Sequence, residues 1–325
     1  MMKKILSFLL FLILIISSIF YMNSVVIDKS YNRYYMMREE LETKKKESDV
    51  EIYGSCHAYT SFNPMKSNYN GQNKANPSEI IPVTYLHMVE QFKKSKPKVA
   101  LVDIWGVMAY DTYIAKEEIF GYYLKFNLEL LPLNKEKIEV INDIEELDIL
   151  NDNFHLNRYK DRIINWKLSE IDFNYSFKKT REIYETAITS WLYDEMENRF
   201  NHNGYKSQPT ITLEDYETLQ NKINNQTQPV EDVMKKYINK IIELCEENDV
   251  ELIFYRAPYI SKISELKKTN YIADYLGNKK IPFYDLEKEI DFDKLEDFAD
   301  YHHLSDTGAN KATEFLDSKI EKLIE

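Results

Sequence analysis

The stretch KPKVALVDIWG, residues 96–106, is a proline turn followed by an apolar run from Val99 to Trp105. Such a run is typical of a parallel strand that is buried on both faces. Shorter strand candidates lie at residues 49–53, 250–258 and 281–286. Segments with helical spacing of apolar residues alternate with them, at residues 81–92, 230–247, 263–277 and 306–325. This alternation predicts an α/β fold, a three-layer αβα arrangement in which helices cover both faces of a parallel sheet.

Two local features refine this prediction. Ser78 is the residue type that caps a helix, so we expect it to begin the helix that contains Ile81, Tyr85, Met88 and Phe92. Cys245 falls on a helical stripe with Val230, Met234, Tyr237 and Ile241, which indicates a small buried side chain. Cys56, the other cysteine, lies on no such stripe, and we therefore expect two free thiols.

The N-terminus contains a long uncharged segment. Residues 5–27 follow Lys3 and Lys4 without a charge, and at about 1.5 Å per residue they span a hydrocarbon core of about 30 Å. A cleaved signal peptide is the alternative, although no small-x-small cleavage site follows. The two lysines favour a cytoplasmic N-terminus. We expect residues 1–28 to anchor the chain in the cell membrane as a single span, with the remainder extracytoplasmic.

The rest of the chain divides by composition. Residues 29–48 are charged and lack Gly and Pro, which predicts a helical stalk. Residues 49–325 are expected to form one domain, interrupted by a polar, mostly helical insertion at about 107–229. The 44% hydrophobic content is sufficient for a large core, and the net charge of −12 argues against a nucleic-acid partner.

Candidate catalytic groups lie near both ends of this domain. Gly54, Ser55, Cys56 and His57 follow the first strand, and ligands of parallel sheets bind beyond the carboxyl ends of strands. Near the C-terminus, the stretch DYHHLSDTG places Asp300 three residues before His303. A carboxylate at this spacing can hold one imidazole nitrogen while the other nitrogen faces a nucleophile.

Each group also has an ordinary interpretation. An Asp-x-x-His pair occurs by chance, and Cys56 could be a core thiol. A metal site at His302 and His303 is a further alternative, but no cluster of ligands accompanies the pair, so we expect neither a metal nor a cofactor. The combination of the turn and the Asp-x-x-His pair favours a site in which a thiol, an imidazole and a carboxylate converge.

The stretches YGSCHAYTSFNP and DYHHLSDTGANKATEFL together resemble the SGNH (GDSL-type) hydrolase superfamily. The resemblance is to membrane-anchored cell-envelope branches, similar to the D-alanylation protein of lipoteichoic acid synthesis and to polysaccharide O-acetylation proteins. It implies a flavodoxin-like parallel sheet, Gly54 as the motif glycine, Asp300 as the acid and His303 as the base. Cys56 occupies the position of the nucleophilic serine, and Ser55 stands where the family often has an aspartate.

The resemblance implies an acyltransferase or esterase. Its substrates would be acetyl- or D-alanyl-type groups on a cell-envelope polysaccharide or teichoic-acid-type polymer, with an integral-membrane acyltransferase as a further partner. A thiol suits such chemistry, because thiolates are strong nucleophiles. The alternative is that the cysteine has disabled the enzyme and left a module that binds glycan or scaffolds a partner.

The oxyanion hole is the least defined part of the predicted site. The backbone N–H of Cys56 is one candidate donor, and Gly71 resembles the glycine of the family's second block. The family's third-block asparagine should follow the strand Val99–Trp105, where none occurs. Asn73 is the substitute that we expect from the neighbouring loop.

Overall fold

The computed structural model describes residues 47–108, 134–144, 202–209, 226–259, 263–293 and 295–324, together with isolated positions between 4 and 18 and at Asn127, Leu128, Leu131 and Arg199. The chain divides into two compact units, Met1–Glu39 with Leu147–Met196, and Glu40–Glu146 with Glu197–Glu325. Everything described below belongs to the second unit, except for helical positions between residues 4 and 18.

The predicted membrane anchor, stalk and insertion fall largely outside these residues. Within the described part of the chain, no helix is both long and apolar enough to cross a bilayer. Residues 19–46, which include most of the predicted stalk, and most of residues 109–225 are not described. The predictions for these segments therefore remain predictions.

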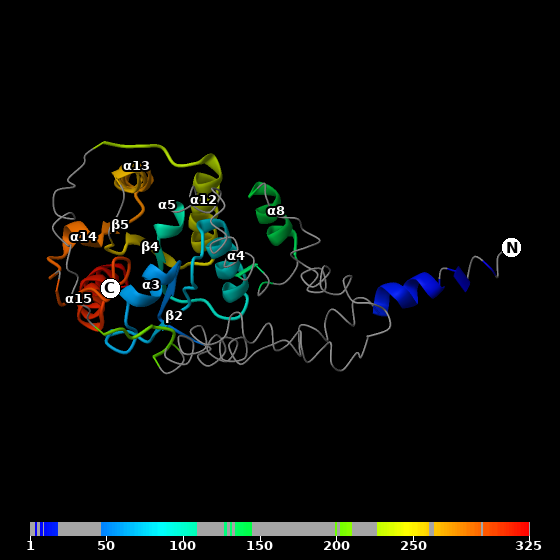
Figure 1. Ribbon diagram of the computed structural model, residues 1–325, viewed down its shortest axis with the longest axis horizontal. Helices are drawn as coiled ribbons and strands as arrows, with labels where there is room; N and C mark the ends of the chain where they lie inside the picture. The colour runs from blue at the N-terminus through cyan, green and yellow to red at the C-terminus, as the bar shows by residue number, and fades with distance from the viewer. Residues whose placement is uncertain are drawn as a thin grey trace, which may run out of the picture. The chain divides into compact units, whose positions relative to one another are not determined.

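The second unit is built on one parallel sheet. Its five strands run in the order β2-β1-β3-β4-β5, and β2, β4 and β5 are labelled in Figure 1. They are β1 (Val50–Tyr53), β2 (Gly71–Asn73), β3 (Val99–Asp103), β4 (Glu251–Arg256) and β5 (Phe283–Asp285). The predicted α/β class with a parallel sheet is confirmed.

The central position of β3 explains its composition. It pairs with β1 through Val99 and Val50 and with β4 through Val99 and Glu251, and all five of its residues are buried. The edge strand β2 includes Asn73, which the sequence analysis assigned to a loop. A strand of three residues carries too little pattern to be recognised from the sequence.

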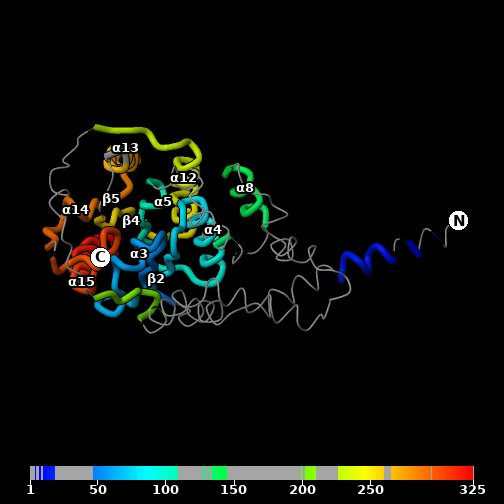
Figure 2. Tube along the Cα trace, viewed as in Figure 1, coloured from blue at the N-terminus to red at the C-terminus, as the bar shows by residue number. Residues whose placement is uncertain are grey.

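Helices of the second unit form two groups (Figure 2). α4 (Ile81–Phe92) contacts α12 (Asp232–Glu247), and α3 (Cys56–Ser61) contacts α15 (Asp306–Ile324). Since crossovers between parallel strands are right-handed, the two pairs cover opposite faces of the sheet. The remaining described helices are α5 (Trp105–Met108), α8 (Lys135–Asp143), α13 (Ile263–Asn278) and α14 (Leu286–Glu289).

The local predictions had mixed outcomes. The stripe on α12 is confirmed, since Met234, Tyr237, Ile241 and Cys245 are all buried, and both cysteines are free thiols.

The prediction that Ser78 caps α4 is wrong. Ser78 has a positive φ of 52° within the preceding loop, and α4 begins after Ile80 without a side-chain cap. Pro82 in the first turn fixes the start of this helix instead.

Candidate functional site

The turn after β1 presents Cys56 at the first position of α3. Gly54 has a φ of +126°, a conformation that side-chain-bearing residues rarely adopt, and a Cβ there would lie 3.0 Å from the Cβ of Asp103. Ser55 then caps α3, because its Oγ accepts a hydrogen bond from the backbone N–H of His57 at 3.2 Å. The turn therefore leaves Cys56 partly exposed at the carboxyl end of β1.

Asp300 and His303 lie on the loop that leads into α15. A carboxylate oxygen of Asp300 accepts hydrogen bonds from the backbone N–H groups of His302 at 2.7 Å and His303 at 2.9 Å. The same carboxylate lies 2.8 Å from Nδ1 of His303. The loop is closed by a hydrogen bond from the N–H of Ala299 to the carbonyl of His303. One side chain thus holds both the backbone of the loop and the orientation of the imidazole.

Cys56 and His303 are 247 positions apart in the sequence, but His57 links them in space: its Nδ1 lies 3.7 Å from the sulfur of Cys56, and its ring lies 5.3 Å from the ring of His303. Burial by itself lowers the pKa of His303, but the negative charge of Cys56, together with Asp300, raises it to about 10. Burial by itself raises the pKa of Asp300, but the hydrogen bond and the charge of His303 lower it to about 2. These directions favour a His303 imidazole that carries a proton and is held by an ionised Asp300.

The imidazole nitrogen of His303 that Asp300 does not hold is Nε2. Nε2 of His303 is buried and makes no hydrogen bond of regular geometry within the described residues. The ring of His57, which contacts the sulfur, lies 5.3 Å from this imidazole. Catalytic hydrogen bonds are often long or poorly aligned in proteins without substrate, so this geometry is compatible with a nucleophile and base.

His57 was named from the sequence as part of the turn after the first strand, but no role was predicted for it. Its ring is buried and stacks on Trp105 with centroids 4.6 Å apart, and it lies 5.3 Å from the ring of His303. Its Nδ1 lies 3.7 Å from the sulfur of Cys56 and 3.2 Å from Oγ of Ser55. Its place next to the predicted nucleophile was the available signal.

The charge state of His57 differs from that of His303. Burial lowers the pKa of His57 well below its usual value, and the positive charges of His303, His302 and Arg256 lower it further. The site therefore contains one neutral and one protonated imidazole near the same sulfur.

Asp103 is a site residue that the sequence did not identify. It is fully buried at the end of β3, where it accepts a hydrogen bond from Oγ of Ser55 at 3.0 Å and from the N–H of Ala257 at 3.4 Å. Burial raises its pKa to about 7, although the hydrogen bonds and the charge of Arg256 oppose this shift. The available signal was a charged residue within an otherwise apolar strand. Because the residues around Asp103 are apolar, the segment was interpreted only as a buried strand.

Two of the three predicted oxyanion donors lie elsewhere. Gly71 pairs with Val50, level with the start of β1. It is three residues, or about 10 Å at 3.3 Å per residue, from the end of the strand that leads to Cys56. The remaining predicted donor at the site is the N–H of Cys56, which as the first amide of α3 has no acceptor within the helix.

Asn73 is also removed from the predicted oxyanion hole. Both protons of its side-chain amide are used, since it donates to the carbonyl oxygens of Ala58 at 3.0 Å and Phe62 at 3.2 Å. We therefore assign Asn73 the role of holding α3 against β2, in place of the predicted donor role.

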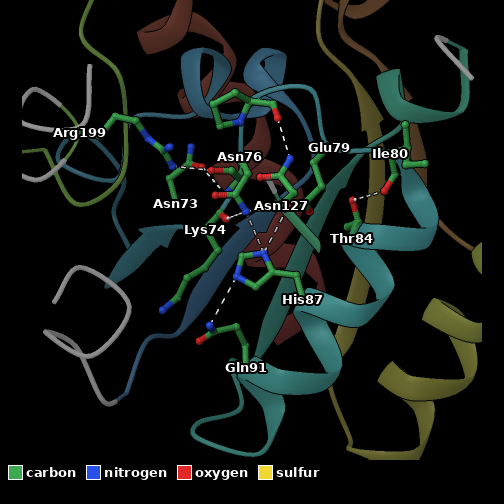
Figure 3. A network of polar contacts seen from close by, with 12 residues as sticks. Asn73, Lys74, Asn76, Glu79, Ile80, Thr84, His87, Gln91, Asn127 and Arg199 are labelled. Atoms are coloured by element: carbon green, nitrogen blue, oxygen red, sulfur yellow. Dashed lines mark hydrogen bonds and ion pairs between the residues drawn. The ribbon is translucent and has the colours of Figure 1, made fainter. Parts of the chain in front are cut away.

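A buried polar network supports the loop that follows β2 (Figure 3). The backbone N–H of Asn76 donates to the carbonyl of Gly54 at 2.9 Å, which ties this loop to the turn that carries the nucleophile. The side-chain amide of Asn76 in turn donates to Glu79 at 2.6 Å and lies 3.1 Å from Nδ1 of His87. All three side chains are buried, so the turn before Cys56 rests on a fixed framework.

Comparisons with known proteins assign no family. No protein-family model matches the chain, and no curated protein shows detectable similarity to it. Among the described residues, no group of three potential ligands could hold a metal ion. The functional argument therefore rests on the residues of the site.

Proposed function

We propose that the protein is an SGNH-like acyltransferase or esterase with Cys56 as nucleophile, His303 as acid and base, and Asp300 as the residue that orients His303. The observation that carries this proposal is the approach of Cys56 to an imidazole whose other nitrogen is held by a carboxylate. The strand order β2-β1-β3-β4-β5 is the flavodoxin-like order and supports the finer assignment of an SGNH-like αβα domain.

The charges of the site account for both halves of the reaction. The thiolate of Cys56 attacks the carbonyl carbon of an ester, and protonated His303 gives its proton to the leaving oxygen as the thioester forms. Acylation removes the negative charge that raises the pKa of His303. The imidazole is then neutral and takes the proton of an incoming hydroxyl or water, and it keeps this proton as the thiolate leaves, which restores the starting state.

The location and partners follow from the sequence features. The uncharged segment at residues 5–27 supports a single-span anchor with the catalytic domain outside the cell. A cell-envelope polysaccharide or teichoic-acid-type polymer is the substrate that the resemblance favours, with an integral-membrane acyltransferase as a further partner. Protease added to intact cells should remove the domain, and complete protection would refute this topology.

One observation favours a second candidate, an inactive module that binds glycan or scaffolds a partner. Gly71 and Asn73 do not supply oxyanion donors, and loss of one donor typically costs about 3–4 kcal/mol of transition-state stabilisation. A single donor at the Cys56 N–H predicts slow turnover if the protein is an enzyme.

Turnover of an activated acetyl ester by the full chain separates the two candidates. Cys56→Ala should abolish turnover, whereas Cys56→Ser should retain a measurable rate because a serine suits the same His–Asp pair. Cys245→Ser is the matched control, since that thiol is buried on α12, and it should leave the rate unchanged. If wild type and Cys56→Ala turn over the ester equally, the inactive module becomes the better assignment.

A further inference from the structure

A buried chain of polar contacts runs from the end of β3 to the sulfur of Cys56. Oδ2 of Asp103 accepts a hydrogen bond from Oγ of Ser55 at 3.0 Å, and the same Oγ lies 3.2 Å from Nδ1 of His57. This Nδ1 lies 3.7 Å from the sulfur. Ser55, His57 and Asp103 are each no more than 2% exposed, so water does not compete for these contacts.

The direction of each hydrogen bond follows from counting protons. The hydroxyl of Ser55 has one proton, and an ionised Asp103 can only accept, so Ser55 donates to Asp103. Oγ of Ser55 then accepts from the backbone N–H of His57 at 3.2 Å, and its second lone pair faces Nδ1. A neutral imidazole satisfies this lone pair only when its proton is on Nδ1.

We propose that His57 is a second catalytic histidine whose Nδ1 proton is shared between Oγ of Ser55 and the thiolate of Cys56, and that Ser55 and Asp103 are positioning residues that set its tautomer. The catalytic part of this assignment rests on the proposed acyl transfer, whereas the hydrogen-bond chain does not. His303 and His57 then have different roles in the reaction. His303 exchanges protons with substrate, and His57 stabilises the sulfur anion without changing its charge.

Protonation of Asp103 reverses the direction of the hydrogen bonds between Asp103, Ser55 and His57. The pKa of this carboxyl is raised to about 7, mainly by burial. The N–H of Ala257 holds its other oxygen, Oδ1, so the new proton lies on Oδ2 and is donated to Ser55. Ser55 then donates to Nδ1 of His57, so that the ring proton lies on Nε2 and the thiolate loses one donor.

Other charged and titratable groups lie near Asp103 and His57 and affect their pKa values. Asp103 lies within the fields of Arg256 and Tyr255, and His57 within those of Arg256, His302 and His303. Tyr259 and Cys56 also contact the His57 ring. The neighbouring Cys56 and Asp300 raise the pKa of His303 to about 10 against the effect of burial, and Arg256 remains charged throughout. Of these groups, Asp103 is the one whose pKa of about 7 matches a step near neutral pH.

Nitrogen-15 NMR of the full chain, labelled at histidine, tests the tautomer directly. The signals of His57 are those that disappear in His57→Gln among the six histidines. At pH 8.5 we expect a neutral ring protonated at Nδ1 in wild type. Asp103→Asn should move the proton to Nε2, because the amide then donates to Ser55, and Ser55→Ala should weaken the preference while Ser55→Thr retains it. A wild-type ring protonated at Nε2, or at both nitrogens, would overturn the proposal without requiring any variant to fold.

The rate of Cys56 alkylation by iodoacetamide, measured from pH 5.5 to 9, tests the consequence. A hydrogen bond donated to a charged group changes the equilibrium between thiol and thiolate about tenfold or more. We therefore expect the alkylation rate to rise about tenfold with a midpoint near pH 7, and Asp103→Asn should abolish this rise. Asp317→Asn is the matched control. Asp317 is also a buried acid that accepts from a serine hydroxyl, at 2.8 Å, and a backbone N–H, at 2.7 Å, and its loss should leave the step in place. Identical profiles for wild type and Asp103→Asn would overturn the proposal.

These two measurements need no acyl substrate. A protein that shows the tautomer and the step but turns over no ester would refute the proposed function and leave the positioning chain standing. An active esterase without them would refute only the role of His57 and its partners.

Discussion

Replacement of Asp300 by asparagine tests the assignment of His303 with little change in structure. One oxygen of Asp300 accepts from the backbone N–H groups of His302 and His303, and the amide oxygen of asparagine can keep both bonds. What is lost is the negative charge of Asp300 beside Nδ1 of His303. This charge is one of the causes that raise the pKa of the imidazole to about 10. The variant therefore lowers the pKa of His303 and weakens its orientation while the loop stays folded.

The size of the effect follows from these two losses. General acid–base catalysis contributes about 10²- to 10⁴-fold, and a misoriented imidazole loses most of it, so ester turnover should fall by about 10²-fold or more. A raised histidine pKa means that the imidazolium is present below the folded value and is lost as pH rises through it. In Asp300→Asn this loss occurs at lower pH, so alkylation of Cys56 at pH 8 to 9 should slow relative to wild type.

Asp293→Asn is the matched control for this experiment. Its Oδ1 accepts from the backbone N–H groups of Leu295 at 2.7 Å and Glu296 at 3.1 Å, the same type of turn in the same loop but without a histidine. Turnover and alkylation should stay within about threefold of wild type, the scatter expected away from the reacting groups. If both variants behave alike, Asp300 acts on the loop alone and the triad is refuted.

Two further predictions concern the framework of the site. Gly54→Ala places a side chain at a positive φ and 3.0 Å from Cβ of Asp103. It should therefore lower the free energy of unfolding by about 1–3 kcal/mol and slow Cys56 alkylation. Unchanged denaturation and labelling would show that the alanine causes no strain in the turn. Asn73→Ala leaves the carbonyls of Ala58 and Phe62 without a donor, which should cost about 1–3 kcal/mol in denaturant unfolding and change ester turnover by only a few-fold. A fall of 10² in turnover at unchanged stability would instead restore Asn73 as an oxyanion donor.

The parts of the fold with a strong sequence pattern could be predicted. The apolar run at Val99–Asp103 identified a central parallel strand because a strand buried on both faces has no polar side. The spacing of Asp300 and His303 predicted their hydrogen bond because the geometry is local, within a single turn of loop. Neither prediction required knowledge of distant segments.

Predictions that depended on register or on the use of each hydrogen bond were less successful. Gly71 was assigned to the site from its neighbours, but the pairing of β2 with β1 places it level with the beginning of β1. Asn73 was assigned from its donor groups, yet α3 occupies both of them. Asp103 meets Ser55 only because β1 and β3 are adjacent in the sheet, so no local pattern could reveal the contact.

The most direct test of the central claim is the intact mass of the full chain after brief exposure to an activated acetyl ester. The account predicts one acetyl adduct, which peptide mapping places on Cys56 and which neutral hydroxylamine removes as it does a thioester. His303→Ala should form the adduct more slowly, and an added polyol acceptor should speed its loss if the protein is a transferase. Absence of any adduct on Cys56 in wild type, or its formation at the same rate in His303→Ala, would contradict the assignment of Cys56 and His303 as nucleophile and base.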